Sequence, residues 1–87
     1  LKTLNLCRNN LGDAGVTILA KENKLLKLEE LDLAWNEVGD QGTLALSRST
    51  NFPNLVAVYL DNNLASYDSR EQAKLEANFK KLQSLNI

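Results

Sequence analysis

The feature that most restricts the fold of this chain is a pattern that recurs every 27 residues without insertion or deletion. The segment Leu1-Lys-Thr-Leu4-Asn-Leu6 returns in modified form at 28–33, 55–60 and 82–87. The in-register copies divide the chain into three full repeats and one partial repeat, residues 1–27, 28–54, 55–81 and 82–87. Self-similarity at such a period is typical of solenoid proteins, in which each unit buries its apolar side only by stacking on its neighbours.

Each repeat is predicted to contain a strand, a turn and a helix. Leucine alternates with other residues at the start of the repeat, which is typical of a strand with one buried face. A Gly-Asp turn and an apolar stretch of helical character follow, and strand–helix–strand units of this length favour a parallel sheet. We therefore expect an α/β protein with all helices on one side of the sheet. Strands are predicted near residues 3–7, 30–34, 57–61 and 84–87, and helices near 14–23, 41–49 and 69–79.

The turns that lead into the helices differ between repeats. Asp13 and Asp40 follow glycine in the first two repeats, and a carboxylate there is predicted to cap the helix N-terminus. In the third repeat serines replace the glycines, and Ser69-Arg-Glu-Gln72 fits a capping box, which predicts a later helix start.

An asparagine recurs where each strand ends, at Asn9, Asn36 and Asn63. The backbone leaves the sheet there, and its N–H and C=O groups need new partners. Asparagine carries both donors and an acceptor, so these side chains are predicted to form a structural ladder between adjacent repeats.

The pattern LxxLxLxxNxLGDxGxxxL resembles the ribonuclease-inhibitor-like class of leucine-rich repeats. The matching positions are Leu1, Leu4, Leu6, Asn9, Leu11, Gly12, Asp13, Gly15 and Leu19, then Leu28, Leu31, Leu33, Asn36, Val38, Gly39, Asp40, Gly42 and Leu46. The resemblance implies a horseshoe segment with strands on the concave face and helices on the convex face. It also implies a mostly intracellular family that includes enzyme inhibitors, immune sensors, GTPase-activating proteins and actin-capping proteins.

Composition and charge restrict the kind of partner and the cellular compartment that we expect. The net charge of −1 argues against a nucleic-acid partner, and no apolar run approaches the roughly 20 residues needed to span a bilayer. Cys7 is the only cysteine, so no internal disulfide can form, and there is no glycosylation sequon. These features favour an intracellular, cytoplasmic protein. Neither end carries an atypical capping turn, so we expect a segment of a longer array.

The residues needed for most chemistry are missing. The chain has no histidine, no glycine-rich phosphate loop and no base beside Cys7. We therefore predict no catalytic residue, no cofactor, no metal and no small-molecule substrate.

A protein partner is predicted instead. Trp35 falls at the end of a strand and either packs under Arg8 or contacts the partner. Tyr59 lies mid-strand and projects from the sheet, where it either packs within the chain or contacts the partner. The first ten positions of the three repeats carry two basic and five acidic residues, which favours a partner with a basic patch. The candidate partner-binding residues are Trp35, Tyr59, Arg8, Glu30, Asp32 and Asp61.

Three functions compete. The first is a non-catalytic interaction module of the inhibitor, sensor or adaptor type. The second is a regulator in trans, such as a GTPase-activating leucine-rich repeat protein, and the third is a structural or cytoskeletal scaffold. A stimulated-GTPase assay separates the second from the first, and co-purification with filaments identifies the third.

Overall fold

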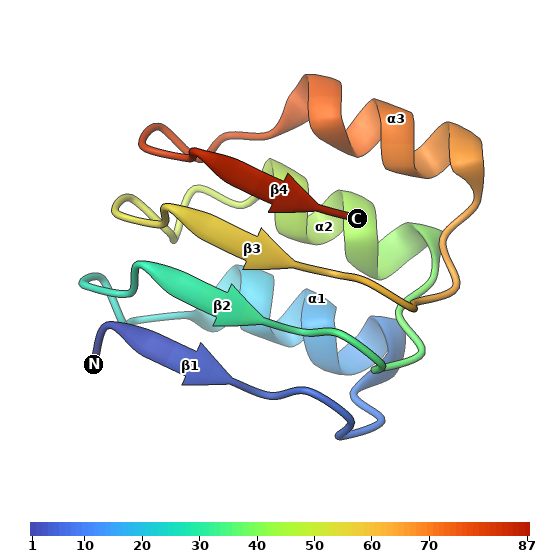
Figure 1. Ribbon diagram of the computed structural model, residues 1–87, viewed down its shortest axis with the longest axis horizontal. Helices are drawn as coiled ribbons and strands as arrows, with labels where there is room; N and C mark the ends of the chain where they lie inside the picture. Colours follow the sequence, from blue (N-terminus) through green and yellow to red (C-terminus); the bar gives the residue numbers. More distant parts are fainter.

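Strands and helices alternate strictly along the chain, as the computed structural model shows for residues 1–87 (Figure 1). The elements are β1 (Thr3–Asn5), α1 (Gly12–Glu22), β2 (Glu30–Asp32), α2 (Asp40–Arg48), β3 (Ala57–Tyr59), α3 (Tyr67–Glu76) and β4 (Ser84–Asn86). The strands form one sheet in the order β1-β2-β3-β4, and every neighbouring pair is parallel. The predicted α/β class with a parallel sheet is confirmed.

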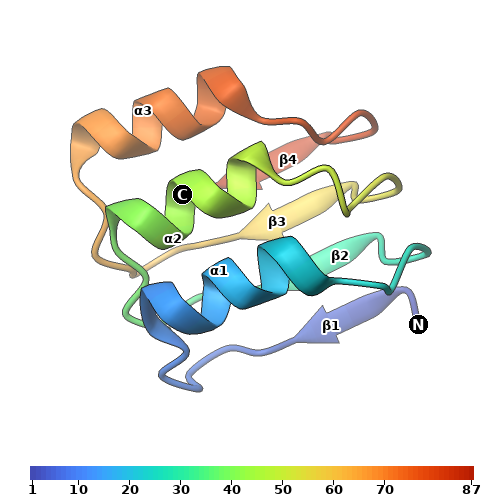
Figure 2. The same ribbon diagram turned by 180° about the vertical axis from the view of Figure 1, so that it is seen from behind.

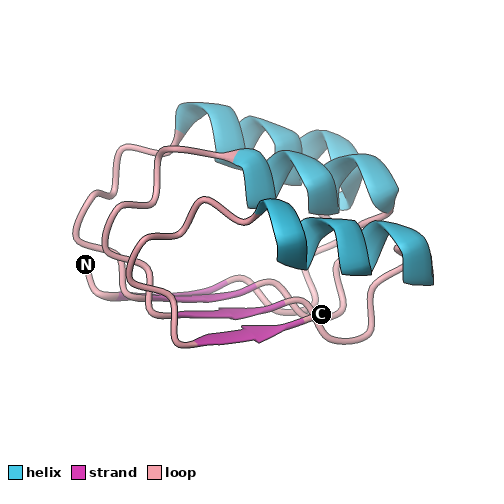
Figure 3. Cartoon of the chain, turned by 90° about the horizontal axis from the view of Figure 1, so that it is seen from above, coloured by secondary structure: helices cyan, strands magenta, loops and turns pink.

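The molecule has two layers, with the sheet on one side and all three helices on the other (Figure 2, Figure 3). Strand register keeps the 27-residue offset, so that Leu4 pairs with Leu31, Leu31 with Val58 and Val58 with Leu85. These side chains point toward the helices, because successive residues of a strand face opposite sides of the sheet. We call the sheet surface without helices the open face.

The core lies between the two layers and spans all repeats. Leu31, Leu33 and Val58 are completely buried within it. Phe52 and Phe79, predicted as core, are buried, and their rings meet edge to face with centroids 6.1 Å apart. Burial of each such side chain stabilises the fold by about 1.5–3 kcal/mol, and most of these contacts cross from one repeat to the next.

The strands are shorter than predicted, although their starts agree. After β2, the Ala34 N–H donates to the carboxylate of Asp32 at 3.0 Å rather than to a neighbouring strand. After β1, the Cys7 N–H donates in the same way to the side chain of Asn5 at 2.9 Å. In both cases a short polar side chain accepts a hydrogen bond from the backbone N–H two residues later, so that this group does not donate to another strand. The regular strand therefore ends there.

The prediction that Asp13 and Asp40 cap their helices is wrong. The N-cap positions are held by Leu11 and Gly39, and neither accepts a side-chain capping bond. Asp13 lies inside the first turn of α1, and Asp40 is the first residue of α2. Both carboxylates instead bond to the following repeat, because its free N–H groups lie within their reach.

The predicted capping box at Ser69 is also wrong. Helix α3 begins at Tyr67, and its cap is Ser66, whose hydroxyl oxygen accepts from the Ser69 N–H at 3.2 Å. Ser66 has a φ of −67°, so it does not need the left-handed conformation that Gly12 adopts in the first repeat at φ +64°. Serine therefore replaces glycine at this position and supplies a cap.

Candidate functional site

The open face carries two columns of outward-pointing side chains, one on each side of the inward leucine column. Glu30 lies between Thr3 and Ala57 in the first column. The second column places Tyr59 directly beside Asp32. Neighbouring parallel strands lie about 4.8 Å apart, so the side chains within a column are close neighbours. The open face therefore brings an aromatic ring and two carboxylates together.

Each of the first three strands is followed by a sharp bend, at residues 8–10, 35–37 and 62–64. The first residue of every bend is left-handed, with φ of 62° at Arg8, 57° at Trp35 and 60° at Asn62. Such a conformation is uncommon outside glycine and is unusual for a residue as bulky as tryptophan. Since the same conformation recurs in all three repeats, these side chains leave the backbone in the same direction and form a third column.

Arg8 and Trp35 are in contact within this column. The guanidinium carbon of Arg8 lies 5.2 Å from the centre of the Trp35 ring, in cation–π geometry. The ring is nevertheless 50% exposed. An exposed contact of this kind stabilises the fold by about 0.5–1 kcal/mol, so Trp35 both packs within the chain and remains accessible.

The carboxylates of this surface form no ion pairs. The two ion pairs of the chain, Arg48–Glu76 and Lys74–Glu71, both lie on the helical side. Glu30 and Asp61 are exposed, and Asp32 is half-buried. The open face and its bends therefore present uncompensated negative charge.

The predicted candidates fall into two neighbouring groups. Arg8, Trp35 and Asp61 lie at or beside the bends, whereas Asp32 and Tyr59 lie on the strands. Glu30 belongs to the strand group but occupies the other column.

Sequence reasoning missed the last residue of each bend, namely Asn10, Glu37 and Leu64. Asn10 and Glu37 are also left-handed, with φ of 52° and 57°. Asparagine adopts this conformation more readily than most residues, but no local signal marks it at Glu37, and only the 27-residue column could have linked the two residues to Leu64.

The asparagine column holds these bends in place. The side-chain oxygen of Asn36 accepts from the N–H groups of Asn9 at 3.0 Å and Leu11 at 3.2 Å. Its amide nitrogen donates to the Leu6 carbonyl at 2.8 Å and to two carbonyls of its own repeat. Asn63 repeats the arrangement one repeat later, accepting from the N–H groups of Asn36 and Val38. The bend that carries Trp35 is therefore fixed from both sides.

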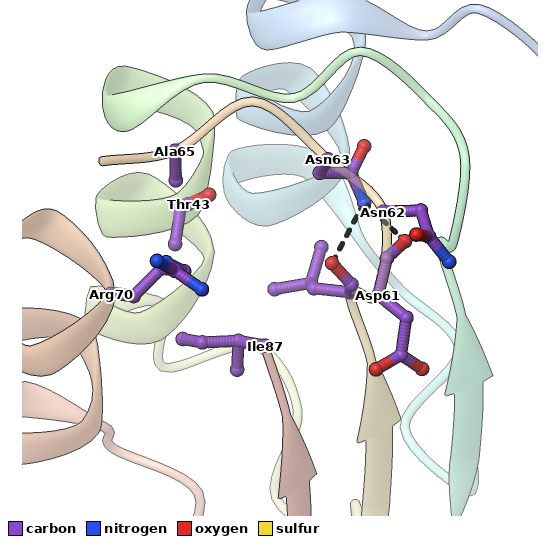
Figure 4. Close-up of a pocket in the computed structure, with 8 residues that line it drawn as sticks. Thr43, Asp61, Asn62, Asn63, Ala65, Arg70 and Ile87 are labelled. Carbon is purple, nitrogen blue, oxygen red and sulfur yellow. Dashed lines mark hydrogen bonds between the residues drawn. The ribbon is translucent and has the colours of Figure 1, made fainter. Parts of the chain in front are cut away.

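A cavity of about 410 Å³ lies between α2, α3 and the end of β4 (Figure 4). Thr43 and Arg70 border it on the helix side, and Asn63 and Ile87 border it on the sheet side. Ala65 occupies the position that Leu11 and Val38 hold in the earlier repeats, and its smaller side chain leaves this space open. The cavity thus follows from the packing of the third repeat.

No chemical centre emerges from the geometry. No group of three or more Cys, Asp and Glu side chains is placed to hold a metal ion. Cys7 is a half-buried free thiol. None of the three helices combines the length and hydrophobicity of a membrane-crossing segment.

A stack of strand–turn–helix units with one shared core, an asparagine column and an unoccupied sheet face defines a repeat protein that displays a surface. The sequence matches a family described as Leucine Rich repeat over residues 1–20 and 24–47, together just over half of the chain. The chain belongs to the leucine-rich repeat family. Searches of curated proteins and of solved structures found no match. Leucine-rich repeats generally mediate protein–protein interaction, and the family is typically non-enzymatic.

Proposed function

We propose that this chain is a non-catalytic interaction module, of the inhibitor, sensor or adaptor type, that binds a protein through its open face and the adjoining bends. The observation that carries this proposal is the accessible Trp35 ring beside a sheet face where Tyr59 stands next to carboxylates. Aromatic side chains dominate the energetic centres of protein interfaces.

The finer assignment within the family belongs to the same proposal. The turn sequences Gly12-Asp13-Ala-Gly15 and Gly39-Asp40-Gln-Gly42 support the ribonuclease-inhibitor-like class. In such an array the open face is concave, because helices are wider than strands and the stack curves around the sheet. An intracellular setting is supported by the free thiol of Cys7.

The size of the open face supports a longer array. Four strands about 4.8 Å apart, each with a regular part of three residues that rise about 3.3 Å apiece, cover on the order of 20 Å by 10 Å. A standard interface buries about 800 Å² on each partner. We propose that further repeats complete the binding surface and that the acidic residues steer a partner with a basic patch toward it.

Affinity capture with the full-length protein and its variants tests the proposal. A partner retained by the wild type should be lost with Trp35→Ala or Tyr59→Ala, with binding weakened by about 1–2 kcal/mol or more for each. The exposed Lys21 on α1 supplies the control, and Lys21→Ala should retain the partner. Loss with Lys21→Ala and retention with both aromatic variants would place the function on the helices.

A further inference from the structure

The bends enclose a hollow of about 440 Å³ on the surface of the molecule. Its walls come from the first and last residues of each bend, so every repeat contributes a pair. The lining residues are Arg8, Asn10, Trp35, Glu37, Asn62 and Leu64. The central repeat thus places an aromatic ring and a carboxylate in the same hollow.

Only one of the two repeats that flank Trp35 places a cation against its ring. Arg8 of the first repeat stacks on it at 5.2 Å. The third repeat holds the neutral Asn62 in the same column, so this column supplies no second cation. An aromatic ring in water attracts cations through its negative face, and arginine is especially suited because its planar guanidinium stacks.

The charge of the hollow favours a cation as well. Glu37 is exposed and forms no ion pair within the chain. Asp61, also exposed, directly precedes Asn62 and adds negative charge beside the hollow. Arg8 keeps its positive charge while it stacks on the ring from the first repeat, so the negative charge that favours a second cation lies on the side of the second and third repeats, at Glu37 and Asp61.

The third repeat supplies an apolar wall. Leu64 lines the hollow and is 68% exposed, so its apolar side chain is accessible there. An arginine side chain has an aliphatic stem that covers apolar surface while its head remains with charged groups. The ring and the carboxylate therefore match the guanidinium of an arginine side chain, and the leucine matches its aliphatic stem.

We propose that this hollow binds an arginine side chain of a basic protein segment, with the guanidinium between Trp35 and Glu37 and the aliphatic stem against Leu64. The inference rests on the proposed function and identifies the chemistry that the partner must present. It moves the centre of recognition from the strands to the bends, and it assigns a role to Glu37 and Leu64.

Trp35 is the only tryptophan of the chain, so its fluorescence reports directly on this hollow. The probe is a short acetylated peptide with two arginines, and its control is the same peptide with citrulline, which keeps the shape and loses the charge. Titration at low salt should give a saturable change in Trp35 emission with the arginine peptide and none with the citrulline peptide. Added salt should weaken the response, because the contact is exposed.

Variants locate the effect within the hollow. Glu37→Gln should weaken binding of the arginine peptide roughly threefold to tenfold, as expected for an exposed charged contact next to an aromatic ring. Glu22→Gln removes another exposed carboxylate, from the end of α1, and should leave binding unchanged. Circular dichroism of both variants checks that the fold is retained.

Equal responses to both peptides, or equal effects of the two variants, would overturn the arginine site. So would the absence of any saturable response to the arginine peptide. If capture of a partner depends on Trp35 but the peptide does not bind, the proposed function stands and the arginine site fails. If the peptide binds with the expected dependence on Glu37 while capture is insensitive to Trp35 and Tyr59, the site stands and the proposed function fails.

Discussion

The carboxylate of Asp13 in the first repeat accepts a hydrogen bond of 2.7 Å from the backbone N–H of Gly42 in the second. The same oxygen accepts from the Gly39 N–H at 2.8 Å. Two N–H groups at the start of α2, which have no partner within their own helix, are thus satisfied by the preceding repeat. The carboxylate also places negative charge at the positive end of α2. One side chain therefore ties adjacent repeats together at the start of α2, in addition to the apolar contacts of the shared core.

Replacement of Asp13 should loosen this connection. Asp13→Ala is expected to lower the free energy of unfolding by about 1.5–3 kcal/mol, because hydrogen bonds to a charged group are lost and two N–H groups are left without a partner. Urea denaturation followed by circular dichroism measures the change. Asp68 is the matched control, since it is also the second residue of its helix but makes no bond to another repeat. Asp68→Ala should cost less than about 1 kcal/mol, and equal losses would show that the bond between repeats contributes nothing.

Gly42 should resist substitution although it lies inside a helix. A Cβ added there would lie 2.7 Å from the Asp13 carboxylate and from a Val38 methyl group, and 3.1 Å from the Asp13 Cα. Alanine favours an exposed helix by about 1 kcal/mol over glycine, yet here overpacking should reverse the sign, and Gly42→Ala should destabilise by about 1–3 kcal/mol.

A double-mutant cycle separates the two causes of that loss. In the Asp13→Ala background one of the two closest contacts of the added Cβ is gone, so Gly42→Ala should cost clearly less than in the wild type. Strict additivity of the two substitutions would contradict crowding by the Asp13 carboxylate, and it would assign the cost of Gly42→Ala to the contacts with Val38 and the backbone.

Periodicity predicted the architecture, whereas local rules failed at the turns. The inward positions of Leu4 and Leu31 follow from alternation alone, because a buried sheet face tolerates no slip by one residue. Asp13 was expected to cap its own helix, since capping rules consider only neighbours in sequence. The groups that it binds are 26 and 29 residues away, and only the stacked structure brings them within reach.

The hydrogen bond between Asp40 of the second repeat and Ser66 of the third should make the free energy of unfolding depend on pH in the acid range. The Ser66 backbone N–H donates to the Asp40 carboxylate at 2.7 Å, and this bond, aided by the hydroxyls of Ser69 and Ser66, holds the pKa of Asp40 below its ordinary value of 3.8. The folded state thus binds the proton less readily than the unfolded chain. The stabilisation is therefore complete above pH 3.8 and is lost as the pH falls through the lowered pKa of the folded state.

Asp40→Asn should consequently reduce the loss of stability at acid pH, that is, flatten the acid limb of a plot of stability against pH. The midpoint of urea denaturation, measured at a series of pH values, tests this. Glu76→Gln should have a similar and separate effect, because the hydrogen bond from Arg48 lowers the pKa of Glu76. An acid limb unchanged in the Asp40→Asn variant would show that the bond to Ser66 does not persist in solution.

The candidate site could be predicted only in part. Trp35 and Arg8 fall in one column of the repeat, and their contact was one of the two readings that the sequence allowed. Glu37 and Leu64 were not singled out, because a lone glutamate or leucine in a turn carries no signal by itself. Their place in one hollow depends on left-handed bends at non-glycine residues, and fixed neighbouring repeats, rather than local preference, hold that conformation.

Asn36 and Asn9 occupy the same position in successive repeats but should differ in their contribution to stability. The Asn36 side chain is completely buried, accepts two backbone N–H groups of the first repeat and donates to carbonyls of both repeats. Asn9 is exposed, and its amide donates only within its own repeat, to the Leu6 and Cys7 carbonyls. Removal of Asn36 therefore leaves buried groups of two repeats without partners, whereas water can replace what Asn9 provides.

Asn36→Ala should destabilise by at least about 3 kcal/mol and broaden the urea transition, and Asn9→Ala should destabilise by about 1 kcal/mol or less. Equal losses in the two variants would mean that the column acts within single repeats and does not join them.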